Sequence, residues 1–497
     1  MTLKGTMNTA NYLLETGADH RLALIDGEQS YTYGELRAAV VALTHALVAN
    51  EVQPQAHVAI FGPNTYFWIA AYLAILKLGA VAVPFSPAAK PAQLAEMQKL
   101  VACQVVCAPA AQLTPAHRTV FGDCVVITEA ALTADLSAGP VGPSSAEVAP
   151  TQLAALMLTS GTTARPRAVC VTHRNIQANT NSIIAALEIG LDDRMLVVLP
   201  FHYCFGTSLL HTHLRAGATL VLANNAALPE VLLNELEAHS CTSFAGVPSV
   251  YQLLLRNSTF PRRSLPALRT FQQAGGKLQP VLIEELTALR PTARIFIMYG
   301  QTEATARLSY LPLEQMQAKR GSIGRGLPGV KLRVVNEAGQ EVRPGEVGQI
   351  IAYGENVTAG YLNDPESTAR TFVGGALHTG DLATVDADGY IYIVDRQSDF
   401  IKPLGHRVSS HEIEACVLAL PDVLAAAAIG VPDPLLGEAI RVYVTLRPGA
   451  VLDEQAMLAH YKRTLPRYMT PKQIVILAQL PMNSQGKVLK TALRQLV

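Results

Sequence analysis

The chain has no excess of charge of either sign. It contains 39 Lys and Arg residues and 39 Asp and Glu residues among 497, so its formal net charge at pH 7 is zero. Proteins that bind nucleic acid or anionic membranes through their overall charge need a net positive surface. The balance argues against both classes of partner, and we expect no nucleic acid, although a local basic patch remains compatible with it.

Cysteine pairs at the spacing of metal sites or redox motifs are also absent. The seven cysteines are odd in number, scattered along the chain, and include no CxxC pair. Cys103 and Cys107 lie four residues apart, but no second Cys or His pair follows at zinc-finger spacing. We therefore expect buried free thiols in a reducing compartment rather than a disulfide framework.

The sequence shows neither a signal peptide nor a clean membrane span. Residues 1–20 lack an apolar core of signal-peptide length, which predicts a cytoplasmic location. Residues 66–84 are almost wholly apolar, but Lys77, Gly79 and Pro84 interrupt the run, and a span needs about 20 apolar residues. The run instead predicts a buried helix that stops at Gly79 and is followed by a short strand.

The composition is typical of a folded chain with a large apolar core, and patterns typical of helices and of strands alternate along it. Hydrophobic residues make up 49% and charged residues 16%, outside the range of disordered chains. Thr32 and Glu35 form a capping-box pattern, which predicts a helix that runs to about Val48. Apolar runs typical of buried parallel strands lie at residues 58–61, 105–107, 125–128, 196–199, 219–222 and 295–298. Together these features predict a large α/β body of mixed sheets flanked by helices.

The pattern of predicted helices and strands changes after about residue 325. Segments typical of short strands joined by tight turns follow at residues 330–335, 348–352 and 390–394. Beyond Asp395 we expect a small α+β unit with a helix at 410–420 and a strand at 425–431. The sequence therefore predicts two domains, residues 1–395 and residues 396–497.

A cluster of hydroxyl side chains directly follows one of the apolar runs. It consists of Thr159, Ser160, Gly161, Thr162 and Thr163, with Arg165 and Arg167 after it. Backbone N–H groups, hydroxyl donors and fixed positive charge together suit a polyphosphate. The segment is not a Walker A loop, because the G-x-x-x-x-G-K-[ST] spacing is absent.

Further polar residues stand at turns later in the chain. Thr302 and Glu303 follow the run at 295–298, at the end of a strand where open α/β sheets bind ligands, and a glutamate there can hold Mg²⁺. Asp381 follows a glycine turn and suits ribose hydroxyls, and Arg396 and Lys487 lie near the predicted domain boundary and the C-terminus. These residues predict a nucleotide- or phosphate-using α/β enzyme.

In combination, the motifs resemble those of the adenylate-forming superfamily. Its members include acyl- and aryl-CoA synthetases, stand-alone adenylation enzymes of peptide and polyketide assembly lines, and beetle luciferases. Five motifs match in order and spacing, at residues 159–167, 299–303, 378–381, 395–402 with 405–407, and 483–487. The resemblance covers the chain from about residue 20 to its end. It implies a large N-terminal body and a small, mobile C-terminal domain that rotates on a hinge.

The resemblance also implies a two-step reaction. A carboxylate attacks the α-phosphorus of Mg·ATP and gives an acyl-adenylate and pyrophosphate. A thiol, either that of CoA or that of a pantetheine-bearing carrier protein, then displaces AMP. ATP and Mg²⁺ are the implied cofactors, and a small carboxylic acid or amino acid is the implied substrate. Positioning and charge stabilisation supply most of the rate enhancement in such transfers.

The family pattern assigns the catalytic roles residue by residue. Lys487 would bridge the carboxylate and the α-phosphate and then swing away for the thiol step. Thr302 would contact the α-phosphate, and Glu303 would bind Mg²⁺. The β- and γ-phosphates would be held by Thr159, Ser160, Gly161, Thr162, Thr163 and Arg167. The nucleoside would be held by Tyr299 and Gly276 near the adenine and by Asp381 and Arg396 at the ribose hydroxyls.

Three features depart from the usual pattern of the family. Arg167 replaces the lysine of the phosphate loop, so the charge is retained. Ala164 and Ala168 replace glycines, and the loop should be stiffer as a result. Ser398 occupies the hinge position, where Asp or Lys is common.

The family builds its acid pocket around the segment that begins at residue 201. Here the pocket residues would be His202, Phe205, Ala245, Gly246, Gln273 and Gly275. Residues 194–229 contain no Asp or Glu, whereas relatives that activate amino acids commonly place an Asp there to pair the substrate's ammonium group. The absence favours an uncharged aliphatic or aromatic acid.

Two other functions remain open from the sequence. One is a stand-alone amino-acid adenylating enzyme, for example one that loads proline onto a carrier protein supplied in trans. The other is a relative that binds nucleotide without turnover, although the presence of Glu303, Asp381, Arg396 and Lys487 argues against it. Nothing in the sequence calls for luciferase-like oxygenase chemistry.

Overall fold

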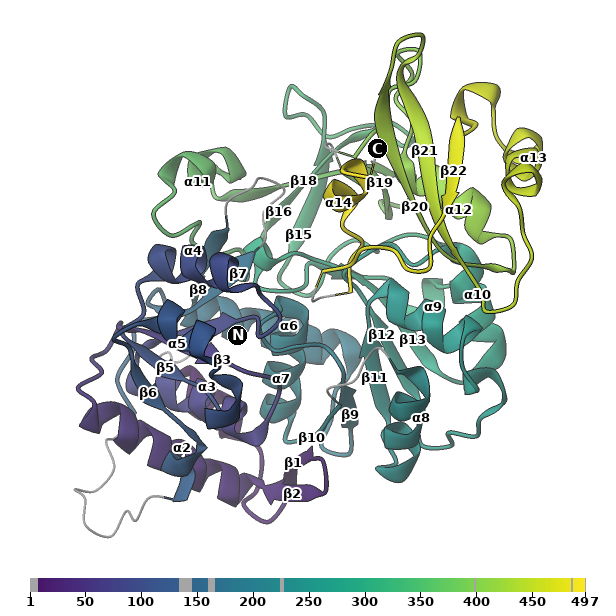
Figure 1. The fold of residues 1–497 in the computed structure, drawn as a ribbon. Helices are drawn as coiled ribbons and strands as arrows, with labels where there is room; N and C mark the ends of the chain where they lie inside the picture. Colours follow the sequence, from purple (N-terminus) through teal and green to yellow (C-terminus); the bar gives the residue numbers. More distant parts are fainter. Residues whose placement is uncertain are drawn as a thin grey trace.

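The protein is described here by a computed structural model, which covers residues 8–133, 145–159, 166–223, 228–396, 399–483 and 486–496. Within these residues the strands form four sheets. Two large sheets and the helices around them make the N-terminal body, and two smaller sheets follow (Figure 1). This arrangement confirms the predicted α/β class with a large N-terminal domain and a small C-terminal domain.

The largest sheet positions most of the functional residues. Its eight strands run in the order β14-β13-β12-β11-β9-β10-β1-β2. They are β1 (Leu22–Asp26), β2 (Gln29–Thr32), β9 (Arg194–Val197), β10 (Thr219–Leu222), β11 (Ser243–Gly246), β12 (Thr270–Gln273), β13 (Arg294–Tyr299) and β14 (Ser309–Tyr310). All pairs from β13 to β1 are parallel, and only the edge strands β2 and β14 are antiparallel. The carboxyl ends of β11, β12 and β13 therefore meet at one edge of the sheet.

A second, six-stranded sheet carries the predicted phosphate loop. Its order is β6-β5-β3-β4-β7-β8. The strands are β3 (His57–Phe61), β4 (Val81–Phe85), β5 (Val105–Cys107), β6 (Val125–Ile127), β7 (Leu153–Thr159) and β8 (Arg167–Thr172). Strands β7 and β8 are antiparallel neighbours, and Thr159 lies opposite Arg167.

Helices cover both large sheets and fill the space between them. Those of the N-terminal body are α1 (Thr9–Leu14), α2 (Tyr33–Ala49), α3 (Tyr66–Leu78), α4 (Pro91–Val101), α5 (Pro115–Phe121), α6 (His173–Leu187), α7 (Cys204–Ala216), α8 (Pro229–Ala238), α9 (Pro248–Arg256), α10 (Pro280–Leu289) and α11 (Pro365–Thr371). Helix α3 is buried on all sides from Phe67 to Leu76, as expected for a helix that is apolar around its whole circumference. It shares one hydrophobic core with strands of both sheets.

A five-stranded antiparallel sheet continues the large body. It contains β15 (Lys331–Val335), β16 (Gly348–Tyr353), β17 (Phe372–Val373), β18 (Ala376–Val385) and β19 (Ile391–Arg396). Asp381 on β18 pairs with Arg396 on β19. The strand register therefore brings a carboxylate and a guanidinium together at the end of this sheet.

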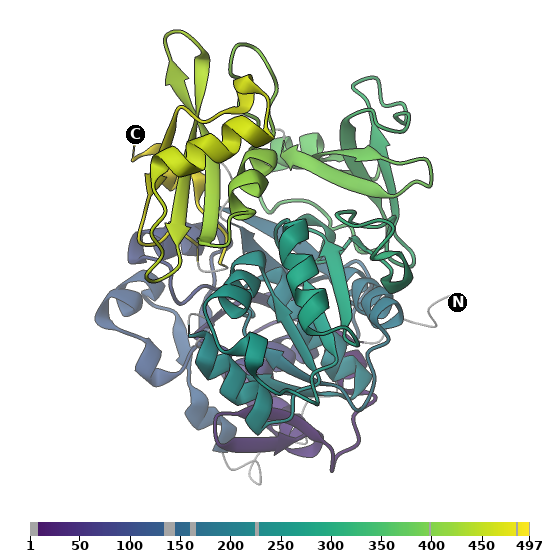
Figure 2. The same ribbon diagram turned by 90° about the vertical axis from the view of Figure 1, so that its right-hand side faces the viewer.

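The last part of the chain forms a small α+β domain with its own core. It contains β20 (Val423–Asp433), β21 (Gly437–Leu446), β22 (Gln473–Ile476), α12 (Ser410–Leu418), α13 (Glu454–Thr464) and α14 (Lys490–Arg494). The domain lies over the edge of the large body (Figures 1 and 2). The exact boundary at residue 396 stays a prediction, because β19 runs to Arg396 within the large body's sheet and the small core begins only at Ile401.

Several local predictions are confirmed, and some strand limits move by a few residues. Thr32 and Glu35 form the capping box, and α3 ends at Gly79, which has a positive φ of 75°. The strand expected at 196–199 is β9 at 194–197, and the one expected at 390–394 is β19 at 391–396, because pairing with neighbouring strands sets the limits. The seven cysteines form no disulfide, and five of them are buried. In the part of the chain that the structure covers, no helix is long and apolar enough to cross a membrane.

Candidate active site

The site is centred on Lys487, which the small domain inserts against the large body. Its Nζ lies 5.5 Å from the centre of the Tyr203 ring. Just before it, the carbonyl oxygen of Gly486 accepts a hydrogen bond of 2.9 Å from Ser249 Oγ of α9. A Cβ atom on Gly275 would lie 2.9 Å from Tyr203 Oη and 3.7 Å from Lys487 Cε, so a glycine keeps this passage open. The lysine therefore meets the body at the carboxyl ends of β11 and β12.

Electrostatic neighbours show which groups surround this ammonium. Burial lowers the pKa of Lys487, and the positive charge of Arg396 lowers it further, while the carboxylates of Asp381 and Glu303 act in the opposite direction. The residues that the sequence assigned to catalysis and ribose binding thus act on one cation. Such a convergence of charged groups is typical of an active site rather than of a solvated surface.

Asp381 is held by two partners in a fixed geometry. Tyr299 Oη donates a hydrogen bond of 2.6 Å to one carboxylate oxygen, and Arg396 Nε lies 3.2 Å from the other. Asp381 is only 5% exposed, and burial raises the pKa of Tyr299 well above its ordinary value, so the phenol stays protonated. The carboxylate keeps free lone pairs, which can accept hydrogen bonds from two hydroxyl groups.

Glu303 and Thr302 lie on a 3₁₀ turn (η5, Thr302–Ala304) directly after β13. The chain approaches itself closely here, because a Cβ on Gly300 would lie 2.0 Å from the carbonyl oxygen of Ala306. Tyr361 Oη donates a hydrogen bond of 2.8 Å to Glu303 Oε1. Thr302 Oγ1 donates to Cys204 Sγ at 3.4 Å, which joins the turn to the first residue of α7.

This carboxylate fits a magnesium site. Mg²⁺ keeps several waters and takes one or two protein carboxylates together with substrate phosphates. Glu303, oriented by Tyr361, can be that protein carboxylate. Among the residues described, no cluster of three or more His, Cys, Asp or Glu could hold a metal ion by itself.

The hairpin of β7 and β8 borders the same turn. The Arg167 guanidinium lies over the Tyr361 ring, with Cζ 5.1 Å from its centre, and Nε is 3.7 Å from Asp364 Oδ2. Arg167 is therefore close to the tyrosine that binds Glu303. Four residues of the predicted phosphate loop, Ser160, Gly161, Thr162 and Thr163, lie outside the described residues, as does the predicted hinge Ser398.

The predicted acid pocket gathers around the start of α7. His202 and Phe205 are 9% and 3% exposed, and burial lowers the pKa of His202 to about 4, so its ring is neutral at pH 7. Ala245 and Gly246 end β11. Gln273 ends β12 and donates a hydrogen bond of 2.8 Å to the carbonyl oxygen of Gly276. The fold brings these segments to one sheet edge, while their roles in binding stay predictions.

Three residues of this region were not assigned a role from the sequence. Tyr203 stands between two predicted pocket residues and could have been found from its position alone. Tyr361 carries no local signal, because its contact with Glu303 depends on the pairing of its segment with β8. Arg307, four residues after Glu303, is 1% exposed and lies over the Phe205 ring with Cζ 4.8 Å from its centre.

Comparison with known proteins gives matches along nearly the whole chain. Residues 15–362 match the family model described as AMP-binding enzyme, and residues 412–487 match the model of the AMP-binding enzyme C-terminal domain. A feruloyl-CoA synthase of Amycolatopsis is 32% identical over 96% of each chain. A sulfoacetate–CoA ligase of Cupriavidus necator is 32% identical over 96% of this chain and 93% of its own. The crystal structure of ATP-bound MatB from Rhodopseudomonas palustris is 27% identical, covers 98% of both chains and has a TM-score of 0.88.

We expect Asp381→Asn to weaken ATP binding by about ten- to a hundredfold. The amide cannot form the charged contact with Arg396 and is a weaker acceptor, and hydrogen bonds to charged groups contribute about 1.5–3 kcal/mol. Isothermal titration calorimetry measures the change. Asp388→Asn is the matched control, because Asp388 is an exposed acid that pairs with Lys319 at the next turn. Equal affinities of Asp381→Asn and wild type would contradict the assignment.

Proposed function

The chain belongs to the family of AMP-binding enzymes and is an AMP-forming acid–thiol ligase, and we propose that its acyl acceptor is coenzyme A. Relatives named as CoA ligases match this chain from near its beginning to near its end, including both matched domains. The names of these relatives give CoA as the acyl acceptor. The observation that carries the acceptor is the match to relatives named as CoA ligases, while the electrostatic coupling of Lys487 to Glu303, Asp381 and Arg396 supports the adenylation step.

In the first step we propose that the ammonium of Lys487 stabilises the charge that develops between the attacking carboxylate and the α-phosphate. One carboxylate oxygen forms a bond to phosphorus, and the bond to the bridging oxygen of pyrophosphate breaks. Thr302 contacts the α-phosphate, and Asp381 and Arg396 hold the ribose. Fixed charges in a dry site cost no reorganisation as the reaction proceeds.

The phosphates and the metal lie on the other side of the site. Bound Mg²⁺ neutralises phosphate charge, and Glu303, oriented by Tyr361, is the protein ligand that we assign to it. Thr159 and Arg167 flank the loop that holds the β- and γ-phosphates. Tyr299 positions Asp381 through its hydroxyl and, with Gly276, borders the adenine.

In the second step a thiolate attacks the acyl carbon, and the carbon–oxygen bond to AMP breaks. We propose that Lys487 leaves the site before this step, when the small domain rotates about a hinge near Ser398. Contacts that join the small domain to the body include the Ser249–Gly486 hydrogen bond and the two bonds of 3.1 and 2.8 Å that Arg256 donates to the carbonyl oxygens of Leu418 and Val423. Beside the hinge, Ser409 and Ser410 also donate hydrogen bonds to Asp395. The loop at 405–407 would then face the thiol.

The pocket favours an acid without an ammonium group. The charged residue beside Phe205 is the cation Arg307, and it forms no salt bridge within the described chain. A substrate ammonium placed next to a buried guanidinium would be repelled, because the low dielectric of the interior strengthens the interaction between like charges. Amino acids such as proline are therefore disfavoured as substrates.

Acid-dependent exchange of pyrophosphate into ATP tests the function. The panel contains uncharged aliphatic and aromatic acids, dicarboxylic acids, and amino acids that include proline. We expect exchange with one class that lacks an ammonium group, and formation of the corresponding CoA thioester, detected by mass spectrometry, when CoA is added. Exchange with an amino acid, or transfer to a carrier protein but not to CoA, would contradict the proposal. A nucleotide-binding relative without turnover would give no exchange with any acid.

The pH dependence of the exchange reaction follows from the lowered pKa of Lys487. The first step needs the protonated amine, and burial favours the neutral form. We therefore expect kcat/KM for ATP to fall with rising pH at a midpoint below the ordinary lysine pKa. This parameter reports groups of the free enzyme. In Lys487→Arg the residual activity should not fall over the pH interval in which the wild type loses activity, because a guanidinium stays charged. The same midpoint in both proteins would assign the titration to another group.

A further inference from the structure

Arg307 is held rigidly inside the large body. Its amide donates a hydrogen bond of 3.3 Å to Asn179 Oδ1 of α6, and its carbonyl oxygen accepts bonds from Asn179 Nδ2 at 2.8 Å and Asn356 Nδ2 at 3.1 Å. With its backbone fixed and 1% of its surface exposed, the side chain cannot reach solvent by a local movement of the loop.

The guanidinium is left without an anion. Its Nη2 donates a hydrogen bond of 3.2 Å to Gln272 Oε1, while Nε and Nη1 have no hydrogen-bond partner among the described residues. Burial lowers the pKa of this group to about 9, so it stays charged at neutral pH. A buried, unpaired charge is costly, and buried arginines in proteins are normally paired.

Another buried arginine of the same chain is paired with a carboxylate, as buried arginines usually are. Arg256 is 7% exposed, and it pairs with Glu285 at 2.7 Å in addition to its two carbonyl acceptors. Arg307 has only a neutral amide and the face of Phe205, whose cation–π contact offsets a small part of the missing pairing. Three N–H donors on Nε and Nη1 therefore remain for a group that the described chain does not supply.

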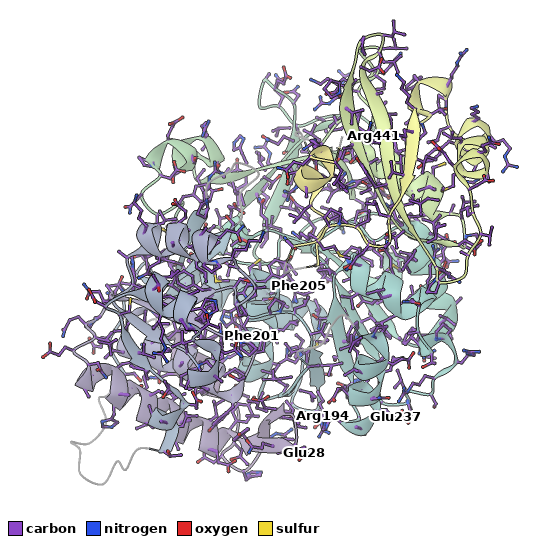
Figure 3. All side chains as sticks on the ribbon, viewed as in Figure 1. Glu28, Arg194, Phe201, Phe205, Glu237 and Arg441 are labelled. Atoms are coloured by element: carbon purple, nitrogen blue, oxygen red, sulfur yellow. The ribbon has the colours of Figure 1, made fainter. Side chains whose placement is uncertain are left out.

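The guanidinium lies against one wall of the predicted acid pocket. The Tyr203 and Phe205 rings, 6.4 Å apart between centres, form one wall at the start of α7. Lys487 lies against Tyr203, and Arg307 lies against Phe205. Phe205 is 3% exposed and lies near the centre of the view in Figure 3. Two cations thus stand against neighbouring parts of the same wall.

The other titratable groups near the guanidinium are neutral at pH 7. Burial raises the pKa values of Tyr203 and Cys204 and lowers that of His213 to about 4. None of the three supplies the missing negative charge. A ligand is the remaining source of a counter-ion on this side of the site.

We propose that the acid substrate carries a second carboxylate, which binds Arg307 while its reacting carboxylate lies at Lys487. The proposal rests on the function assigned above and narrows its substrate to dicarboxylic acids. Because the Phe205 ring lies against the guanidinium, the proposal requires this ring to move aside when the second carboxylate binds. The proposal departs from the uncharged acid expected from the sequence, which stays untested. That expectation considered acidic residues between 194 and 229 only, and Arg307 lies outside this segment.

Matched pairs of acids test the proposal in the full-length enzyme. Each pair keeps the skeleton and exchanges a methyl group for a carboxylate, as in butyrate and succinate, hexanoate and adipate, or 4-methylbenzoate and terephthalate. We expect the wild type to prefer the diacid of at least one pair by about tenfold or more in kcat/KM of pyrophosphate exchange, as one charged hydrogen bond allows. A sulfonate analogue of the preferred diacid distinguishes recognition of charge alone from recognition of a carboxylate. Preference for the monoacid in every pair would overturn the proposal.

The variants separate recognition from a structural role. Arg307→Met should lower kcat/KM for the preferred diacid by about ten- to a hundredfold and leave that of the matched monoacid unchanged or higher. Arg307→Lys keeps the charge and should retain part of the preference. Arg320→Gln, which removes an exposed arginine paired with Glu284, is the control. An equal loss for both acids in Arg307→Met would show that Arg307 only supports the fold.

Thermal unfolding gives a readout that does not depend on turnover. The preferred diacid, or succinate and adipate if no acid is turned over, should raise the Tm of the wild type in the presence of a non-hydrolysable ATP analogue, and not that of Arg307→Met. Without ligand, Arg307→Met should unfold at the same or a higher temperature, because it removes an unpaired buried charge. Absence of exchange with any acid would refute the proposed function, whereas equal stabilisation of both proteins by the diacid would refute the role of Arg307.

Discussion

The structure depends on one costly arrangement, a lysine cation taken out of water and held between two domains. Burial disfavours the charge of Lys487, and the carboxylates of Asp381 and Glu303 oppose that effect. Neither carboxylate is on the small domain, so Lys487 meets them only while the domains are docked. Docking contacts outside the site include the hydrogen bonds of Arg256 and Ser249 and those of Ser409 and Ser410 to Asp395. A domain that can move and carries this lysine is suited to a reaction that needs the cation in one step only.

Each group around this lysine is positioned by a partner from another part of the fold. Tyr299 at the end of β13 fixes Asp381 on β18, and Tyr361 fixes Glu303. The parallel order of β11, β12 and β13 brings the predicted acid pocket to the same edge. The site therefore needs the eight-stranded sheet, the five-stranded sheet and the small domain together. The second cation, Arg307, adds a positive charge to the predicted acid pocket. This charge attracts carboxylates and repels ammonium groups.

The sequence was informative where local chemistry decides the structure. The capping box at Thr32, the end of α3 at Gly79 and the strand-end position of Glu303 follow from residue types and spacing alone. Tyr361 could not be predicted, because its place beside Glu303 depends on hydrogen bonds between distant segments. Arg307 could be seen in the sequence, but only the fold shows that no carboxylate of the described chain faces it. The strand limits near 199 and 396 moved for a similar reason, since they depend on neighbouring strands.

We propose that Lys487 serves the adenylation step and not the thiol step. Measuring the two half-reactions of Lys487→Ala separately tests it most directly. Pyrophosphate exchange reports the first step, and conversion of a supplied acyl-adenylate to the CoA thioester reports the second. We expect exchange to fall by several orders of magnitude while thioester formation stays close to that of the wild type. Equal losses in both half-reactions would contradict the claim.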